Sequence, residues 1–128
     1  MRKVNIFWFR RDLRLNDNAG LFKALQSDYP VLPIFIFDTD IIDELPEDDA
    51  RLTFIYSALS GMNDKLKSEC NSSIALYHGK PKEIFSKLIE DYDIQNVFTN
   101  RDYEPYAKER DGEIEKLLSD KEIAFKTF

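Results

Sequence analysis

The sequence predicts an α/β fold, in which a doubly wound, parallel, five-stranded sheet has the Rossmann-like order 3-2-1-4-5 and carries helices on both faces. Two observations predict it. Short apolar runs alternate along the chain with longer segments whose apolar residues recur at helical spacing. The apolar runs contain few polar residues, as do parallel strands that are buried on both faces. Right-handed connections between consecutive strands then favour this order.

Five segments are expected to form the strands. Each is short, rich in β-branched or aromatic residues, and bounded by polar or turn-forming residues. In chain order they are residues 4–9 (VNIFWF), 31–37 (VLPIFIF), 74–78 (IALYH), 96–100 (NVFTN) and 123–128 (IAFKTF).

Four helices are expected between these strands. The first, residues 17–27, is entered through the sequence NDN, whose side chains can cap free N–H groups. We expect it to bury one side, formed by Leu21, Phe22 and Leu25. The second helix, residues 48–68, has an apolar stripe formed by Leu52, Ile55, Leu59, Met62 and Leu66.

The two remaining helices each begin at a proline. Proline suits the first turn of a helix because its missing N–H would have no partner there. Residues 81–92 form the third helix, whose apolar side is Ile84, Phe85, Leu88 and Ile89. Residues 105–119 form the fourth, whose apolar side is Ala107, Ile114, Leu117 and Leu118.

The apolar side of the last helix is interrupted by Arg110 and Asp111. A charge that faces a core must be paired, because an unpaired buried charge is strongly destabilising. We therefore expect Arg110 to lie against a carboxylate. The candidates are Glu104, Asp12 and Asp38.

Length and composition exclude several classes of function. The 128 residues are the length of one domain, and a net charge of −6 disfavours a domain that grips a nucleic-acid backbone. Cys70 is the only cysteine and His78 the only histidine, so a disulfide framework and a metal site of clustered cysteines or histidines cannot be built, and no G-x-S-x-G motif offers a nucleophile for a catalytic triad. No glycine-rich phosphate-binding motif follows the first strand. No apolar segment is long enough to span a membrane, so we expect a cytoplasmic protein without membrane contact.

Charged residues concentrate after the first and the fourth predicted strands, in RRDLRLNDN and NRDYEPYAKERD. In the expected order the two strands lie at the switch point, where the order reverses and such sheets bind ligands. Arginines and carboxylates from both segments can pair into a structural network that fixes the loops. Its expected members are Asp12, Arg14, Asp17, Glu104 and Arg110. The alternative, that some of these groups contact a bound ligand, remains open from the residues alone.

The two charged segments resemble the DNA photolyase and cryptochrome family. WFRRDLRLNDN, residues 8–18, is similar to the amino-terminal signature of that family. FIFD at the end of the second strand, the turn from Gly79 to Pro81, and TNRDYEPYAKERD after the fourth strand resemble the family in the same order. The resemblance extends over the whole chain.

The resemblance implies that residues 1–128 are the amino-terminal α/β domain of a light-driven, FAD-dependent deoxyribodipyrimidine photolyase, which repairs cyclobutane pyrimidine dimers. In the family this domain carries or borders an antenna chromophore. The catalytic FAD and the contact with damaged DNA belong to a following helical domain, which would be the partner of this chain. The chain would then be a fragment without lyase activity of its own. Alternatives are a cryptochrome-type blue-light photoreceptor and a stand-alone nucleotide-binding α/β module.

The resemblance also bears on the antenna. Folate-binding members have Asn and Glu in the loop after the fourth strand, where this chain has Tyr106 and Ala107. The usual folate contacts are therefore missing, and a deazaflavin, a flavin or no antenna remain as alternatives. A flat chromophore would be expected to contact residues at the strand ends. These are Arg10, Phe37, Asp38, Arg51 and Arg101.

Overall fold

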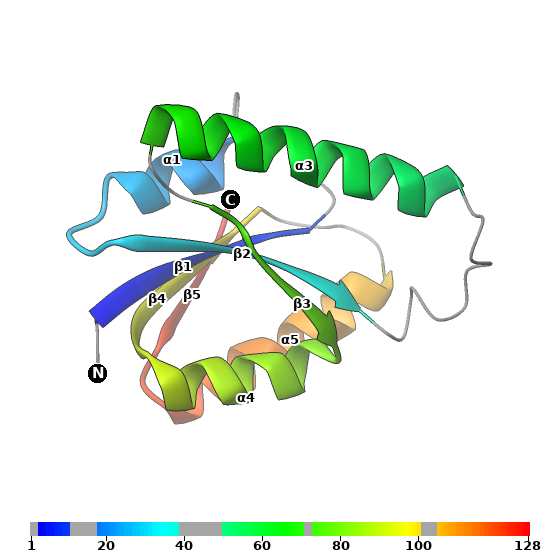
Figure 1. Ribbon diagram of the computed structural model, residues 1–128. Helices are drawn as coiled ribbons and strands as arrows, with labels where there is room; N and C mark the ends of the chain where they lie inside the picture. Colours follow the sequence, from blue (N-terminus) through cyan, green and yellow to red (C-terminus); the bar gives the residue numbers. More distant parts are fainter. Residues whose placement is uncertain (1–2, 11–17, 39–49, 71–72, 101–104) are drawn as a thin grey trace.

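The computed structural model describes residues 3–10, 18–38, 50–70, 73–100 and 105–128. Strands and helices alternate along the chain (Figure 1). The strands are β1 (Lys3–Phe9), β2 (Val31–Asp38), β3 (Ala75–Gly79), β4 (Asp93–Thr99) and β5 (Ala124–Thr127). The helices are α1 (Ala19–Leu25), α3 (Ala50–Cys70), α4 (Pro81–Asp91) and α5 (Pro105–Asp120).

The strands form one parallel sheet with the order β3-β2-β1-β4-β5, which confirms the predicted fold class and strand order. β1 is central and pairs with β2 on one side and with β4 on the other. In register, Trp8 lies opposite Ile34 of β2, while Phe7 lies opposite Phe98 of β4. The order therefore reverses between β1 and β4, as expected for a doubly wound sheet.

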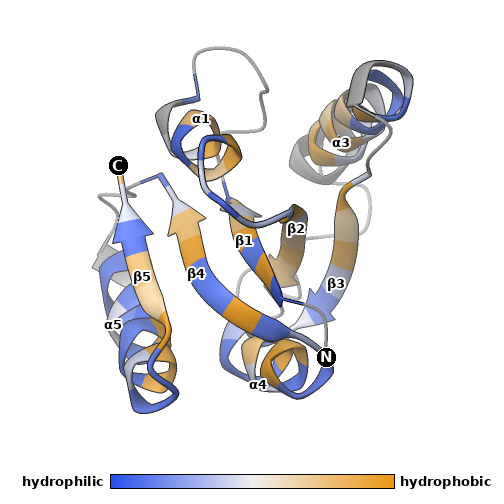
Figure 2. Cartoon of the chain, turned by 90° about the vertical axis from the view of Figure 1, so that its left-hand side faces the viewer, coloured by the Kyte–Doolittle hydropathy of each residue, from blue (hydrophilic) through white to orange (hydrophobic). Residues whose placement is uncertain are grey.

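Helices cover both faces of the sheet, α1 and α3 on one face and α4 and α5 on the other (Figures 1 and 2). Successive residues of a strand point to opposite faces. Trp8 accordingly belongs to the core beneath α4 and α5, with Phe85 and Ile114. Phe7 and Phe9 belong to the core beneath α1 and α3. The hydropathy colouring in Figure 2 shows the apolar residues of α4 turned toward the sheet.

The predicted apolar sides of three helices are confirmed. Leu59, Met62 and Leu66 of α3 are buried, and Ile55 packs against them. On α4 and α5 the buried apolar residues include Phe85, Leu88, Ile114 and Leu118. Pro81 occupies the first turn of α4, as its missing N–H predicts. The side chains of Leu52 and Ala107 lie outside the described residues.

The prediction for the first helix is confirmed for Leu21, which is buried, but is wrong for Phe22 and Leu25 and for the C-terminal end of the helix. Phe22 and Leu25 are 60% and 64% exposed, whereas Leu21 and Ala24 are buried. The helix ends at Leu25, and the following turn includes a hydrogen bond from the backbone N of Ser27 to the carbonyl of Ala24. α1 lies close to the sheet at Gly20, where a Cβ would be 2.8 Å from a ring carbon of Phe7. This close approach leaves no room for a larger side chain at that position.

Candidate functional site at the switch point

Arg10, directly after β1, is a buried cation at the switch point. It is 8% exposed, and its guanidinium donates to the carboxylate of Asp111 on α5 and to the carbonyl oxygen of Asn100, directly after β4. The side chains of Arg10 and Asp111 are 3% and 16% exposed, so the ion pair is largely shielded from water. Guanidinium groups suit such positions because their donors form a rigid, directional fork. Arg10 thereby joins the ends of β1 and β4 to α5.

Trp8 is the aromatic neighbour of this ion pair. The guanidinium carbon of Arg10 lies 5.1 Å from the Trp8 ring centroid, and that of Arg110 lies 5.0 Å from it. Both distances are typical of cation–π contacts. Phe85 of α4 packs edge-on against the same ring with centroids 5.1 Å apart, and Trp8 is 1% exposed. Trp8 is therefore a core residue of the central strand.

Asn100, directly after β4, is hydrogen-bonded to the start of α1. Its Oδ1 accepts a hydrogen bond from the backbone N of Gly20 at 2.8 Å, and its Nδ2 donates to Oδ1 of Asn18 at 2.6 Å. Oδ1 of Asn18 also accepts from the backbone N of Leu21 at 3.0 Å and so caps α1, which confirms the predicted capping role for this segment. The start of α1 is therefore hydrogen-bonded to the end of β4.

The predicted network residues are only partly described. Arg110 lies against a carboxylate, but the one that the structure shows is Asp111, with Arg110 Nε 3.9 Å from its Oδ1. Asp38 ends β2 opposite Gly79, and Arg51 lies in the first turn of α3; their side chains lie outside the described residues. Also outside are Asp12, Arg14, Asp17, Arg101 and Glu104. Their pairing stays a prediction.

The proposed chromophore contacts Arg10 and Phe37 point to opposite faces of the sheet. Arg10 reaches Trp8 and Asp111 on the α4–α5 face. Phe37 belongs to the core beneath α1 and α3, where its ring stacks on that of Tyr56 of α3 at 5.1 Å with 28° between the planes. Phe37 is 6% exposed but Tyr56 is 58% exposed. One flat ligand would therefore not lie against both Phe37 and the guanidinium of Arg10.

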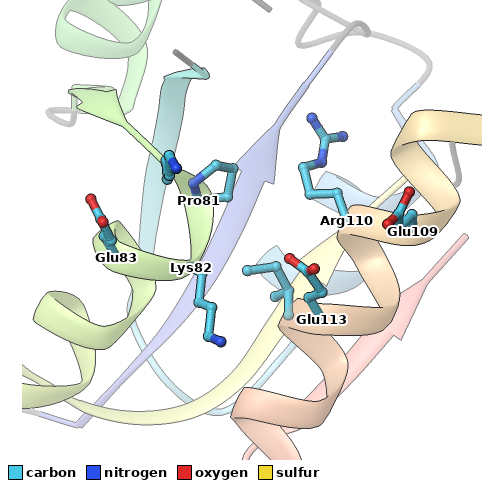
Figure 3. A pocket seen from close by; sticks show the side chains of 8 residues that line it. Pro81, Lys82, Glu83, Glu109, Arg110 and Glu113 are labelled. Carbon is cyan, nitrogen blue, oxygen red and sulfur yellow. The ribbon is translucent and has the colours of Figure 1, made fainter. Parts of the chain in front are cut away.

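A cavity of about 400 Å³ lies between the start of α4 and α5 (Figure 3). Its lining consists of Lys80, Pro81, Lys82, Glu83, Glu109, Arg110, Glu113 and Ile114. Figure 3 shows Arg110 on α5 facing Pro81 on α4 across this space. The lining has three cationic and three carboxylate side chains, and this balance selects neither an anionic nor a cationic ligand.

Among the described residues, no group of His, Cys, Asp and Glu could hold a metal ion. No helix within the described ranges is long and apolar enough to cross a membrane.

Tyr77 on β3 has a pKa above its ordinary value, chiefly because burial disfavours the phenolate, with Tyr92 and Asp91 adding to the effect.

The sequence places the segment of residues 100–111 at the switch point, but it does not single out Asn100 or Asp111 among the expected network residues. Gly20 is missed as a member of the site. A usable signal was present for Asp111, because a carboxylate beside an inward-facing arginine in a segment that starts at the switch point is placed to pair with Arg10. The close approach of Gly20 to Phe7 and Asn100 has no such signal in the sequence.

Comparisons with known proteins agree with the resemblance of the two charged motifs. The family model described as DNA photolyase matches residues 5–128. The chain is 30% identical over 113 residues to a deoxyribodipyrimidine photo-lyase of Synechococcus sp., which covers 88% of this chain and 23% of that protein. It is 30% identical over 129 residues to cryptochrome-1 of Drosophila melanogaster, which covers 97% of this chain and 24% of that protein.

Solved structures show the same similarity. An archaeal photolyase from Sulfolobus tokodaii, described with two FAD molecules, has a TM-score of 0.85 and 30% identity, covering 98% of this chain and 29% of its own. A cryptochrome from Synechocystis sp., with a TM-score of 0.87 and 18% identity over 98% of this chain and 27% of its own, supports the fold alone. The chain spans about a quarter of the length of the curated relatives described above. Since the family model matches nearly the whole sequence, the chain belongs to the DNA photolyase family.

Proposed function

We propose that this chain is the amino-terminal, antenna-side domain of a light-driven, FAD-dependent deoxyribodipyrimidine photolyase that repairs cyclobutane pyrimidine dimers. The observation that carries the proposal is the switch point. Arg10, Asn100 and Asp111 come from the two motifs that resemble the family, and Arg10 donates hydrogen bonds to both Asn100 and Asp111. The 30% identity to a photo-lyase over 88% of the chain supports it independently.

We assign the catalytic FAD and the contact with damaged DNA to a helical domain outside this chain. The chain spans 23% of the length of its Synechococcus relative, which leaves room for such a domain in the full-length protein. The charge of −6 supports the same division, because a phosphate backbone is attracted by lysines and arginines in excess. The partner of this domain is then the remainder of its own protein.

We infer that an antenna chromophore, where one is bound, lies on the α3 side of the switch point. The exposed ring of Tyr56, stacked on the buried ring of Phe37, offers an aromatic surface there, and large flat rings pack well on such surfaces. Asp38, Arg51 and Arg101 are proposed as the polar contacts, and Arg10 as a support of the loops. Bound there, the chromophore would absorb light for transfer to FAD. The missing folate contacts favour a flavin or a deazaflavin, and the two FAD molecules of the Sulfolobus relative support this class.

Light-dependent repair tests the proposed activity. The full-length protein that contains this chain is incubated with DNA that holds cyclobutane dimers, in blue light and in darkness, and the remaining dimers are counted. We expect loss of dimers in blue light only. A cryptochrome-type photoreceptor is the second candidate, supported by the equal 30% identity to Drosophila cryptochrome-1. A protein that binds FAD and leaves the dimers intact in both conditions would favour that candidate and contradict the repair proposal.

A further inference from the structure

A chain of hydrogen bonds between side chains runs through Asn5, which is fully buried on β1. Oδ1 of Asn5 accepts from Nδ2 of Asn96 on β4 at 3.0 Å, and Nδ2 of Asn5 donates to Oγ of Ser27 at 2.7 Å. The hydroxyl of Ser27 donates in turn to the carbonyl oxygen of Ala24 on α1. The buried amide therefore has a partner for its oxygen and for its nitrogen, and it joins β1 and β4 to the end of α1.

The pairing of β1 with β4 changes register at the same residue. Val4 lies opposite Ile94, whereas Asn5 lies opposite Asn96, so that Gln95 is an extra residue in β4. An extra residue of this kind forms a β-bulge, which is rare between parallel strands. Since side chains alternate along a strand, a bulge reverses the faces to which all the following side chains point.

The bulge places the apolar residues of β4 in the two cores. Ile94 and Val97 both lie in the core beneath α4 and α5, although regular alternation would put residues three positions apart on opposite faces. Phe98 lies in the core beneath α1 and α3. A register without the shift would exchange the faces of Val97 and Phe98. Because both faces of this sheet are apolar, burial alone distinguishes the two registers weakly.

We propose that the pair of Asn5 and Asn96 fixes the register of β1 against β4. In the shifted register the two amides meet on the α1 side of the sheet. Without the shift, Asn96 would point into the apolar core beneath α4 and α5, where its amide would be buried away from Asn5. A single buried asparagine fixes the register of coiled coils by the same principle, at some cost in stability.

The register also determines how the ends of β1 and β4 meet at the switch point. In the shifted register the hydroxyl of Thr99 donates to the carbonyl oxygen of Trp8 at 2.8 Å, and the carbonyl oxygen of Asn100 accepts from Arg10. A slip of one residue would move these groups of β4 by about 3.3 Å along β1. Asn5, in the first half of β1, therefore positions Asn100 relative to the buried guanidinium of Arg10.

The first test replaces both asparagines with leucine, which has a similar shape but no hydrogen-bonding group. The 128-residue chain with Asn5→Leu and Asn96→Leu is studied by NMR, and nuclear Overhauser effects locate the Val97 methyl groups. We expect two sets of signals, one with Val97 in the core beneath α4 and α5 and one with Val97 beneath α1 and α3. This double variant should melt at a higher temperature than Asn5→Leu alone, because it leaves no amide of the pair buried without its partner.

Thr99→Val is the matched control. It removes another buried hydrogen bond of β4, the one to the carbonyl of Trp8, and it leaves the residues at the register shift unchanged. We expect a lower melting temperature but a single set of signals, with Val97 in its wild-type core. The control thus separates a loss of stability from a loss of register.

Deletion of Gln95 tests the origin of the second register. Without the extra residue, regular alternation from Ile94 places residue 96 on the α1 side of the sheet and Val97 on the same face as Ile94. The deletion in the double-leucine variant should therefore restore a single set of signals. Where the double-leucine variant does not fold, the deletion should restore folding.

The outcomes decide the proposal without reference to a chromophore or to repair, so they stand apart from the proposed function. Two registers in the double-leucine variant, one in Thr99→Val, and recovery on deletion of Gln95 support it. A double-leucine variant with one set of signals and Val97 in its wild-type core overturns it. Two sets of signals in Thr99→Val overturn it as well, as does a deletion that recovers neither a single register nor folding.

Discussion

Replacing Asp111 with asparagine should destabilise the domain by about 2–3 kcal/mol. Removing one partner of a buried ion pair commonly costs about 3–5 kcal/mol, because the other charge is left buried. The guanidinium side chain of Arg10 is 3% exposed and would remain shielded, which argues for a large effect. The guanidinium of Arg10 would still donate to the carbonyl oxygen of Asn100 and lie over the ring of Trp8. Because these contacts remain and Asp111 is 16% exposed, we expect a loss below the usual range for a broken buried ion pair.

Urea unfolding monitored by Trp8 emission, with circular dichroism in parallel, measures this loss. For a domain of 128 residues the same change lowers the melting temperature by about 6–12 °C. Glu115→Gln is the matched control, since Glu115 is exposed on the same helix, and it should stay within about 0.5 kcal/mol of the wild type. Replacing both partners, as Arg10→Met with Asp111→Leu, should cost less than the sum of the single changes. A loss for Asp111→Asn no larger than that of the control would refute the buried ion pair.

Three further predictions test other parts of the fold. Gly20→Ala should destabilise by about 1–3 kcal/mol in thermal unfolding, because its Cβ would lie 2.8 Å from a ring carbon of Phe7. Phe22→Ser should change the unfolding free energy by less than about 0.5 kcal/mol, since its side chain is 60% exposed, whereas Leu59→Ala should cost about 2–5 kcal/mol; equal losses would contradict the packing of α1. The pKa of Tyr77 is raised in the folded state, so its contribution to stability is present below its ordinary value of 10.0 and is lost as the pH rises through the folded-state pKa. Tyr77→Phe should therefore reduce the loss of stability at alkaline pH, and an unchanged alkaline profile would count against the raised pKa.

The sheet and most of its helices could be predicted because they rest on periodicity. β1 and β2 are predominantly apolar runs, and α3 and α4 repeat their apolar residues every three or four positions. The prediction for the first helix failed because the spacing of apolar residues indicates which side of a helix faces the core, but not how close the helix lies to the sheet. Gly20 lets α1 approach the sheet closely, and at that distance Leu21 and Ala24 fit against it, whereas Phe22 is left in solvent.

The sequence predicts where the charged site lies and which charged segments form it, but not which side chains pair with one another. The rule for doubly wound sheets placed Arg10 at the switch point, and its burial agrees with a paired role. The position of Asp111 beside an inward-facing arginine makes it a candidate partner, but which carboxylate Arg10 meets also depends on how α5 lies against β1. The opposite directions of Arg10 and Phe37 follow from strand alternation once β1 and β2 are in register. The sequence alone does not give that register.

The most direct test of the central claim is the identification of the chromophores of the full-length protein. Its absorption spectrum is recorded after purification from the native host, and the released molecules are identified by mass. We predict FAD together with a second chromophore of the flavin or deazaflavin class, with the second one lost when Tyr56 is replaced by alanine. A protein that carries no flavin would contradict the proposal that this chain is part of a light-driven, FAD-dependent enzyme.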